Sequence, residues 1–459
     1  MVINMRKLLV LLSLAGMLYG CGNSGNGELV GVQNRSKFHQ PDPYGMVYIP
    51  MGSYTMGIGG EDVPKANMRN PKTVTVTAFF MDETEITNNE YRQFVHWVRD
   101  SIARRLLVTN MPDQFGEMIK QPEGENAVPL PPEEAPLNWD SEIEWEDEQV
   151  ADILENQTNF YIPEEERFFR KKEVDARQLN YTYYWIDLQA AARKDYSKTN
   201  PEEGMFGNRD IDRRELVKED EINIFPDTLA WIHDFTYTHN DPIVKRYFWH
   251  PAYDHYPVVG VNWKQARAFS IWRTQLQSSY LRSRDKAISH EFRLPTEAEW
   301  EWAARGGYEG NPYPWGGPYT RNAKGCFLAN FKPMRGDYVD DGGGLTVIVG
   351  HYPPNDFGLY DMSGNVSEWT ADTYDEISDV YKWDFNPYFG YEADDDDAEA
   401  LKRKVTRGGS WKDVAYYLRV TTRDYEYQDT AKSYIGFRNV QDYLGRQKGG
   451  NPSKASNVY

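Results

Sequence analysis

The chain has 459 residues, of which 40% are hydrophobic and 14% aromatic, and its formal net charge at pH 7 is −19. With 14 Trp, 32 Tyr and 20 Phe it can bury a large core, which excludes wholesale disorder, a coiled coil and a collagen-like helix. The acidic balance repels phosphates and argues against nucleic acid as a partner, and two cysteines cannot build a disulfide framework or a cysteine-based zinc site.

The N-terminus carries the pattern of a bacterial lipoprotein signal. Arg6 and Lys7 precede an apolar run over residues 8–18, which is too short to span a membrane as a helix. The run ends in Leu-Tyr-Gly-Cys, a sequence similar to the lipobox of lipoprotein signals, with Cys21 as its last residue. We therefore expect a signal peptide over residues 1–20 and a lipid attached to Cys21.

Lipidation would make Cys21 the first residue of the mature chain, anchored by its acyl chains and followed by a polar linker over residues 21–44. Residues 22–27 contain no acidic cluster of the kind associated with export to the cell surface, which favours the periplasmic leaflet of the outer membrane. The alternative is an ordinary secretory signal that is cleaved nearby and leaves Cys21 without a lipid.

The second cysteine, Cys326, is then the one thiol of the mature chain. In an oxidising compartment an unpaired cysteine is either buried and inert or bonded to another chain. We expect Cys326 to be buried, and an intermolecular disulfide through Cys326 is the alternative.

The folded region is predicted to begin with two strands and a helix. One strand runs from Gly45 to Pro50, and a second, alternating strand covers residues 73–80. Thr87 and Glu90 have the spacing of a capping box that opens a helix. The helix has apolar residues at helical spacing, which we expect to be core contacts: Tyr91, Phe94, Val95, Val98 and Ile102.

Residues 101–255 are predicted to be a large acidic and aromatic insertion. They carry 33 acidic and 17 basic residues and so account for 16 of the 19 net negative charges. The acidic runs at 142–148 and 164–166 are typical of solvated surface. The aromatic residues of 181–186 and 235–249 predict that parts of the insertion pack on the core or on a partner.

Two further helices are predicted after the insertion. The first places three core residues at helical spacing: Ala266, Phe269 and Trp272. The second, Glu297 to Arg305, follows a short strand at 292–295, opens with a capping box of Thr296 and Glu299, and closes at Gly306. Glycine-rich and aromatic loops are predicted for most of the remaining chain.

Eight motifs, in the same order as in the family, resemble the formylglycine-generating enzyme (sulfatase-modifying factor) family. They occupy residues 45–57, 84–94, 256–263, 292–307, 313–316, 357–369, 407–411 and 436–438. The resemblance implies an α+β, loop-rich fold related to C-type lectins over residues 45–440, with the insertion at 101–255 and a polar tail at 441–459.

The resemblance also bears on catalysis. Active members of the family oxidise a cysteine on a sulfatase with two cysteines of their own, which bind copper after an Arg-Gly-Gly-Ser motif. Thiolates are the ligands that hold Cu(I). This chain has no cysteine after Ser410, and Asp413 and Leu418 stand where the pair would lie. We therefore predict that the protein is not an enzyme and has no catalytic residues.

Some members of the family carry structural calcium, with one site in the loop that corresponds to residues 364–368. The amide oxygen of Asn365, backbone carbonyls of the loop and the carboxylate of Glu368 are hard ligands that suit Ca²⁺, so Asn365 and Glu368 are the candidate calcium residues. The alternative roles are a turn residue for Asn365 and a surface or ion-paired acid for Glu368. No other cofactor is expected.

The end of the insertion, at residues 223–235 and 247–260, resembles a narrower group, the gliding-motility lipoproteins GldK and PorK of type IX secretion systems in Bacteroidota. This resemblance implies a structural lipoprotein on the periplasmic leaflet of the outer membrane that assembles with PorN (GldN) into a ring. The further partners it implies are the PorL/PorM motor and outer-membrane proteins like PorP and PorG.

Two other functions stay open at this stage. A lectin-like lipoprotein could bind glycans or peptidoglycan through its tryptophans, although buried core positions would account for most of them. The third possible function is an oxidase that holds its metal with ligands other than the cysteine pair. For the assembly function we expect the insertion at 101–255 to form a contact with another copy or with the partner, and acidic surface to dock on a basic one.

Overall fold

The computed structural model describes residues 40–57, 71–122, 130–133, 135–158, 160–187, 191, 216–235, 241–334, 337, 339–340 and 342–445. The predicted signal peptide, Cys21, most of the predicted linker and residues 446–459 of the predicted tail lie outside the described residues. The chain divides into two compact units, Met1–Pro41 and Asp42–Tyr459, and every helix and strand given below belongs to the second unit.

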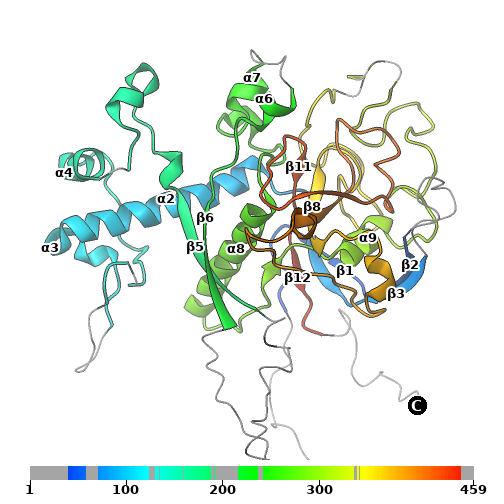
Figure 1. Ribbon diagram of the computed structural model, residues 1–459, viewed down its shortest axis with the longest axis horizontal. Helices are drawn as coiled ribbons and strands as arrows, with labels where there is room; N and C mark the ends of the chain where they lie inside the picture. Colours follow the sequence, from blue (N-terminus) through cyan, green and yellow to red (C-terminus); the bar gives the residue numbers. More distant parts are fainter. Residues whose placement is uncertain are drawn as a thin grey trace, which may run out of the picture. The chain divides into compact units, whose positions relative to one another are not determined.

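The described strands form four sheets (Figure 1). Two sheets have four strands, in the orders β1-β4-β12-β7 and β10-β9-β8-β11, and two are the pairs β2-β3 and β5-β6. All these pairings are antiparallel except that of β11 with β8. The strand bounds are β1 (Met46–Ile49), β2 (Gly52–Met56), β3 (Lys72–Val76), β4 (Phe79–Asp82), β5 (Asn180–Ile186), β6 (Val217–Asn223), β7 (Phe292–Arg293), β8 (Ser367–Thr373), β9 (Arg403–Arg407), β10 (Asp424–Tyr427), β11 (Ile435–Gly436) and β12 (Val440–Asp442).

Two long helices, α2 and α8, contact each other beside these sheets. The α-helix bounds are α2 (Asn88–Asn110), α3 (Pro112–Phe115), α4 (Glu148–Asp152), α6 (Ala230–Asp234), α7 (Pro242–Arg246), α8 (Trp263–Ser283), α9 (Glu297–Arg305) and α10 (Ser378–Tyr381). Single turns of other helix types lie between them. Within the described ranges, none of the helices has both the length and the apolar composition needed to cross a membrane.

The predicted helix starts and the one predicted stop are confirmed. Thr87 and Glu90 form the reciprocal capping box of α2, and Thr296 and Glu299 form that of α9. Gly306 ends α9 with a left-handed φ of 60°, a conformation that glycine adopts without the steric cost of a Cβ atom. These boundaries were predictable because the residues that satisfy the free backbone N–H and C=O groups lie within one turn of them.

The strand predicted over residues 73–80 is wrong as a single element. The chain breaks after Val76, so β3 pairs with β2 while β4 enters a different sheet between β1 and β12. The backbone N–H of Thr77 at the break donates to Oδ1 of Asn386, 2.9 Å away. β2 was not predicted. Its Gly52 lies against Trp302, where a Cβ atom would stand 2.2 Å from the indole ring.

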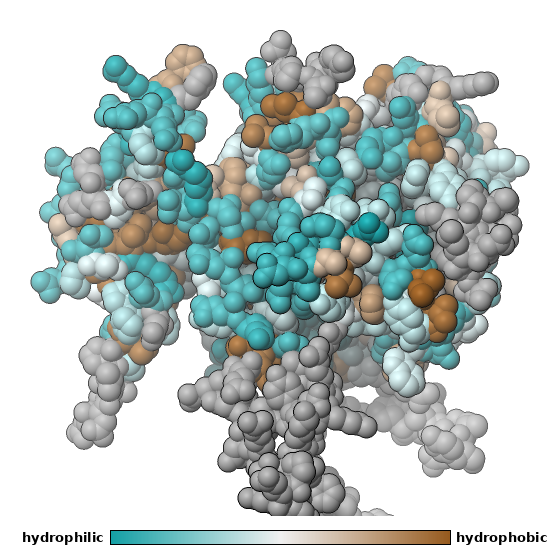
Figure 2. All heavy atoms as spheres, in the orientation of Figure 1, coloured by the Kyte–Doolittle hydropathy of each residue, from teal (hydrophilic) through white to brown (hydrophobic). Residues whose placement is uncertain are grey.

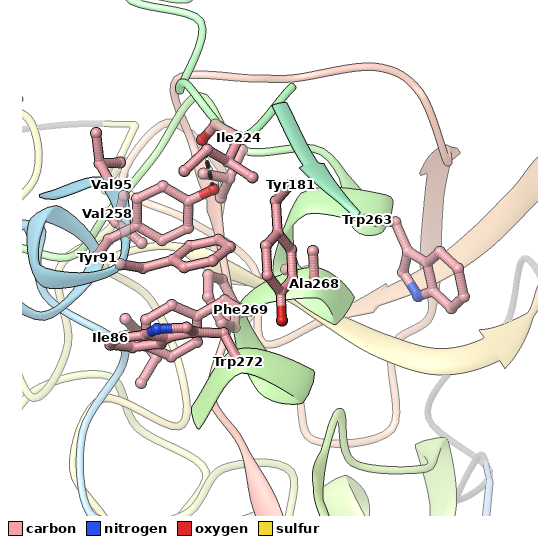
Figure 3. Close-up of a cluster of buried hydrophobic side chains, with 14 of the residues drawn as sticks. Ile86, Tyr91, Val95, Tyr181, Ile224, Val258, Trp263, Ala268, Phe269 and Trp272 are labelled. Atoms are coloured by element: carbon pink, nitrogen blue, oxygen red, sulfur yellow. Dashed lines mark hydrogen bonds between the residues drawn. The ribbon is translucent and has the colours of Figure 1, made fainter. Parts of the chain in front are cut away.

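An aromatic cluster joins α2, α8 and the end of the insertion (Figure 3). The rings of Tyr91 and Phe269 stack with centroids 5.6 Å apart, and those of Phe94 and Trp272 lie 5.1 Å apart. The Tyr91 hydroxyl donates to the carbonyl of Ile224, 2.8 Å away, so its polar end is satisfied inside the core. The core positions predicted for both helices are buried, except that Ile102 is half-buried.

The insertion packs in two ways. Its predicted start at residue 101 falls inside α2, whose second half packs with α4 and the 153–160 segment in a separate apolar cluster. Tyr181 and Tyr183 of β5 instead face the central core, and the ring of Trp231 stacks on that of Trp411, with centroids 5.9 Å apart. The prediction that parts of the insertion pack on the core is therefore confirmed.

We predict that Phe269→Ala lowers the free energy of unfolding by about 3–5 kcal/mol, because the substitution leaves a cavity in the aromatic cluster. Urea unfolding of the full chain, followed by tryptophan fluorescence, measures the change. Ser279→Ala, at an exposed position of the same helix, is the control and should leave the midpoint nearly unchanged. A loss below about 1 kcal/mol for Phe269→Ala would show that this ring does not hold the helices together.

Candidate functional site

A two-glycine turn follows β9 and positions Ser410. Gly408 and Gly409 have φ values of 92° and 67°, which an L side chain rarely adopts. A Cβ atom on Gly409 would also lie 2.8 Å from the carbonyl oxygen of Tyr417. The turn therefore brings the chain after β9 against the segment that contains Leu418, and Ser410 is fully buried there.

Asp413 and Leu418, which stand where the family resemblance places a copper-binding cysteine pair, have other roles. Oδ2 of Asp413 accepts hydrogen bonds from the backbone N–H and the hydroxyl of Ser410, at 3.0 and 2.6 Å. Leu418 is completely buried in an apolar cluster that includes Tyr313 and Phe331. One position is a turn-forming carboxylate and the other a core hydrocarbon, so neither offers the soft sulfur ligand that Cu(I) prefers.

A small cavity lies beside this segment. Its volume is about 20 Å³, enough for one ordered water but not for a peptide side chain. The cavity is lined by several aromatic and proline residues together with Asp361 and Ser363, whose hydroxyl donates to the carbonyl of Leu418, 2.6 Å away. Leu418 is therefore part of the packed core, and Asp413 is held in the turn by Ser410.

Cys326 is not buried as expected. Its side chain is exposed, so the prediction that it is buried is wrong. Its backbone forms a tight turn with Asn322, since the Cys326 N–H donates to Asn322 Oδ1 at 3.0 Å and its carbonyl accepts from the Asn322 N–H at 2.9 Å. The neighbouring Phe327 takes the buried position instead. An intermolecular disulfide through Cys326 stays a prediction.

Asn365 and Glu368, the candidate calcium ligands, are both committed to bonds within the protein. Asn365 has a left-handed φ of 60°, and its Oδ1 accepts from the Val347 N–H at 2.9 Å. Glu368 Oε1 accepts from Nη2 of Arg438 at 2.6 Å, and its Oε2 accepts from Nε of Arg438 at 2.8 Å and from the Trp300 indole at 2.7 Å.

The bonds from Arg438 and Trp300 compete with a calcium ion for the carboxylate oxygens of Glu368. Among the residues that the structure describes, no group of three or more His, Cys, Asp or Glu side chains is arranged to hold a metal. Asn365 has the left-handed conformation of a turn residue and Glu368 is ion-paired, as in the alternative roles. Calcium binding itself stays an untested prediction.

Arg438 is the centre of a buried polar network that the sequence did not reveal. Besides Glu368, its guanidinium donates to the carbonyls of Asp82 at 3.1 Å and Tyr360 at 2.9 Å. A second buried network lies on α9, where Glu297 accepts from Nζ of Lys382 at 3.1 Å. Acidic residues within a tryptophan-rich helix were the one sequence signal that could have indicated buried charge there.

Two further buried acids lie near Glu368. Burial raises the pKa of Glu85 well above its usual value, and the nearby charge of Asp361 adds to this effect. Burial likewise raises the pKa of Asp361 to about 6, although the Gly350 N–H, 2.6 Å from its Oδ2, and the charge of Arg438 oppose the shift. These acids face the packed interior, so their shifted pKa values do not by themselves indicate catalysis.

Comparison with known proteins defines the family. The model of the "sulfatase-modifying factor enzyme 1-like domain" matches residues 33–443, and the chain therefore belongs to that family. Its fold is accordingly of the formylglycine-generating-enzyme type, mixed α+β and rich in loops.

The similar proteins include inactive as well as active members. "Inactive C-alpha-formylglycine-generating enzyme 2" of Mus musculus is 31% identical over 293 residues, which is 59% of this chain and 78% of that protein. Its Bos taurus counterpart is 37% identical over 40% of this chain and 49% of that protein, and the formylglycine-generating enzyme of Mus musculus is 33% identical over 41% and 45%. The chain thus spans about half the length of the last two.

Among solved structures, PvdO from Pseudomonas aeruginosa aligns with 87% of this chain and 94% of its own, at 16% identity and a TM-score of 0.43. The family rests on the domain match over residues 33–443. The comparisons leave the narrower resemblance to GldK and PorK untested.

We predict that Arg438→Met destabilises the protein by about 3–5 kcal/mol, because it leaves the carboxylate of Glu368 buried without its partner. Guanidinium unfolding measures the loss, and the double variant Arg438→Met/Glu368→Leu should lose less than the single one. Lys120→Met, which breaks an exposed ion pair with Asp140, is the control and should change stability little. Equal losses in the single and double variants would contradict a dominant role for the unpaired charge.

We predict that Asp361→Asn stabilises the protein at neutral pH. The folded state keeps the Asp361 proton up to about pH 6, whereas the unfolded chain releases it near its usual pKa of 3.8, so the free energy of unfolding falls as pH rises through this window. Asparagine removes this dependence, still accepts from Gly350 and tolerates the left-handed φ of 54°. The gain should be up to about 3 kcal/mol at pH 7 and near zero at pH 4.

Urea titrations between pH 4 and pH 8 measure this difference, with the exposed Asp396→Asn as the control for a lost surface charge. Parallel pH profiles for the wild type and Asp361→Asn would show that Asp361 does not titrate differently in the folded and unfolded states.

Proposed function

We propose that this protein is a non-catalytic structural lipoprotein of a type IX secretion system, and that it assembles with the partner PorN (GldN) into a periplasmic ring required for protein secretion and, in motile relatives, gliding. The observation that carries the proposal is the replacement of the copper-binding pair by Asp413, which bonds Ser410, and by the buried Leu418. The chain has the family fold but lacks the two cysteines that would bind copper. One fold can serve several functions, so the fold does not require oxidase activity.

The packing around these two positions supports loss of catalysis rather than a rearranged metal site. A thiol introduced at position 418 would stand among aromatic rings in the core, and the carboxylate at 413 is already hydrogen-bonded twice. The remaining thiol, Cys326, lies in a separate turn and cannot supply a pair by itself. Similarity to proteins named inactive formylglycine-generating enzyme 2 agrees with this reading.

The insertion supports an assembly role. It is attached to the core through α2 and has its own apolar cluster, so it presents a fixed surface to a partner. Residues 101–255 together carry most of the net negative charge of the sequence. Charged surface of one sign selects and steers a partner of the opposite sign more than it tightens the complex.

The membrane part of the proposal depends on Cys21, which lies outside the described residues. A lipid on Cys21 would hold the protein on the periplasmic leaflet of the outer membrane, near PorP- and PorG-like outer-membrane proteins and within reach of components of the PorL/PorM motor. The ring would then form by contacts between copies and with PorN.

We predict that the full chain, tagged and extracted in mild detergent from its native membrane, purifies with a PorN-like protein as a ring-shaped particle in electron microscopy. Cys21→Ala should abolish labelling by an alkyne fatty acid and release the protein from the membrane, while the soluble protein still captures the partner. Removal of residues 135–158, which the structure describes, should reduce assembly, and unchanged assembly of the folded deletion variant would show that this part makes no contact.

Three results would contradict this proposal. They are purification of the wild type as a single chain without partner, stoichiometric Cu(I) uptake, or oxidation of a sulfatase peptide. Retention on peptidoglycan or a glycan array would favour the lectin-like function instead. Most tryptophans are buried or half-buried, and Trp139, Trp249 and Trp383 are the exposed ones among the described residues, so this second function has little surface to use.

A further inference from the structure

Five large apolar side chains are exposed within nine residues at α10 and the loop after it, and we call them the apolar–acidic patch: Ile377, Val380, Tyr381, Trp383 and Phe385. Trp383 is 84% exposed and Val380 72%. Single exposed apolar residues are normal, but a cluster of this kind marks an interaction surface. Figure 2 shows an apolar area, in brown, at the side of the molecule where β3 lies in Figure 1.

The patch is held in place by the backbone. Residues 384–386 run alongside β3, where the Thr75 N–H donates to the Asp384 carbonyl at 2.7 Å and the Asn386 N–H donates to the Thr75 carbonyl at 2.8 Å. Ile377, Val380 and Tyr381 have the i, i+3, i+4 spacing that places them on one face of the α10 turn. A surface ordered before binding loses less conformational entropy when it docks.

The charges beside the patch are mainly acidic. Among the side chains of residues 375–385 that the structure describes, Asp375, Glu376 and Asp384 are acidic and Lys382 is basic. Lys382 is buried and pairs with Glu297 and Asp372, so it does not offset the surface charge. Lys72 pairs with Asp384 at 2.8 Å and offsets part of it. The occupant of the patch should therefore combine an apolar centre with positive charge.

The same chain has a surface of that chemistry at the end of α8, which we call the apolar–basic end: Leu276, Tyr280, Ile288, Arg282, Arg284 and Lys286, all exposed. None of its three basic residues forms an ion pair with any other described residue, and the Arg284 guanidinium lies over the Tyr280 ring, 5.5 Å from its centroid. The turn is ordered, since the Lys286 N–H donates to the Leu281 carbonyl at 2.9 Å and Asp285 has a left-handed φ of 52°.

Basic residues at a helix C-terminus have an ordinary explanation, because they interact favourably with the helix dipole. That effect accounts for the charges of the last turn. It does not account for three large apolar side chains exposed beside them, which a dipole does not attract. The combination of both features therefore indicates a docking surface.

The full chain has a formal net charge of −19, so copies of it repel one another and a contact between copies is favoured where opposite charges meet. We propose that the apolar–basic end of one copy docks on the apolar–acidic patch of a second copy. The two surfaces differ, so the contact is heterologous, and repetition closes a ring if the rotation permits. This inference rests on the self-association within the proposed function and names the surfaces that produce it.

The positions of the two surfaces allow such repetition. The patch borders β3, whereas the end of α8 lies beside β12 and β7, since Nε2 of Gln441 donates to Oε1 of Gln277 at 2.8 Å and to the carbonyl of His290 at 2.7 Å. They lie against different sheets of the fold. Each copy therefore offers one surface of each kind to two different neighbours.

Crosslinking of two tagged versions of the full chain tests the contact directly. Both carry Cys326→Ser; one carries Ile288→Cys and the other Val380→Cys. A short bis-maleimide crosslinker should join the two tags in the mixture and should join few copies within either version alone. Association without this crosslink would overturn the proposal. So would protection of Val380→Cys from thiol labelling in the isolated monomer, because residues of the same chain would then cover the patch.

Charge reversal gives an independent measurement by sedimentation velocity. Arg282→Glu/Arg284→Glu/Lys286→Glu should weaken self-association by about tenfold or more, and adding Glu376→Lys/Asp384→Lys to the same chain should restore part of it. The control Lys245→Glu/Arg246→Glu/Lys324→Glu changes the net charge equally at exposed positions elsewhere and should have a smaller effect. Equal weakening by both triple variants, or no weakening, would overturn the proposal.

Failure of this inference can be told apart from failure of the proposed function. If the wild type captures PorN but the triple reversal leaves copy-to-copy contact intact, the surfaces are wrong and the assembly role stands. If copies associate through these surfaces but no secretion partner is captured, the secretion role is wrong and this contact stands.

Discussion

The buried ion pair of Arg438 with Glu368 joins the two four-stranded sheets, and the other elements are arranged around it. Glu368 belongs to β8, and Arg438 lies between β11 of that sheet and β12 of the other. The guanidinium also bonds the carbonyl of Asp82 at the end of β4. Because a buried charge is tolerated only when its partners are all in place, this contact fixes how the sheets meet.

Asp413 and Leu418, at the two positions predicted for the copper-binding cysteines of the family, have structural roles in this chain. The glycine turn before Ser410 is retained and still brings two chain segments together, but Asp413 closes that turn and Leu418 fills an apolar cluster. A thiolate pair is a local chemical requirement, and in this chain a hydrogen-bonded carboxylate and a packed hydrocarbon occupy the two positions without an unsatisfied polar group at Asp413 Oδ2. The scaffold can therefore persist without the reaction and serve as a structural unit.

What the protein adds to the scaffold is surface. The insertion extends from α2 and carries most of the net charge, while the apolar–acidic patch and the apolar–basic end lie on the shared fold. Like charges on copies of a strongly acidic chain oppose self-association, so exposed basic residues such as Arg282, Arg284 and Lys286 favour contact with an acidic surface. Two different, complementary surfaces on one chain allow a repeating contact between copies, and opposite charge is one form of complementarity.

The sequence by itself determined the local features and the family. Capping boxes such as Thr87 with Glu90 set the helix starts because their partners lie three residues apart, and ordered motifs identified the fold without any knowledge of contacts. It also showed the missing cysteines at Asp413 and Leu418. Only the tertiary structure showed that residues 73–80 divide between two sheets, that Cys326 is exposed and that Glu368 pairs with Arg438. Each of these features depends on residues that are distant in the chain, and the spacing and periodicity of a sequence do not report such contacts.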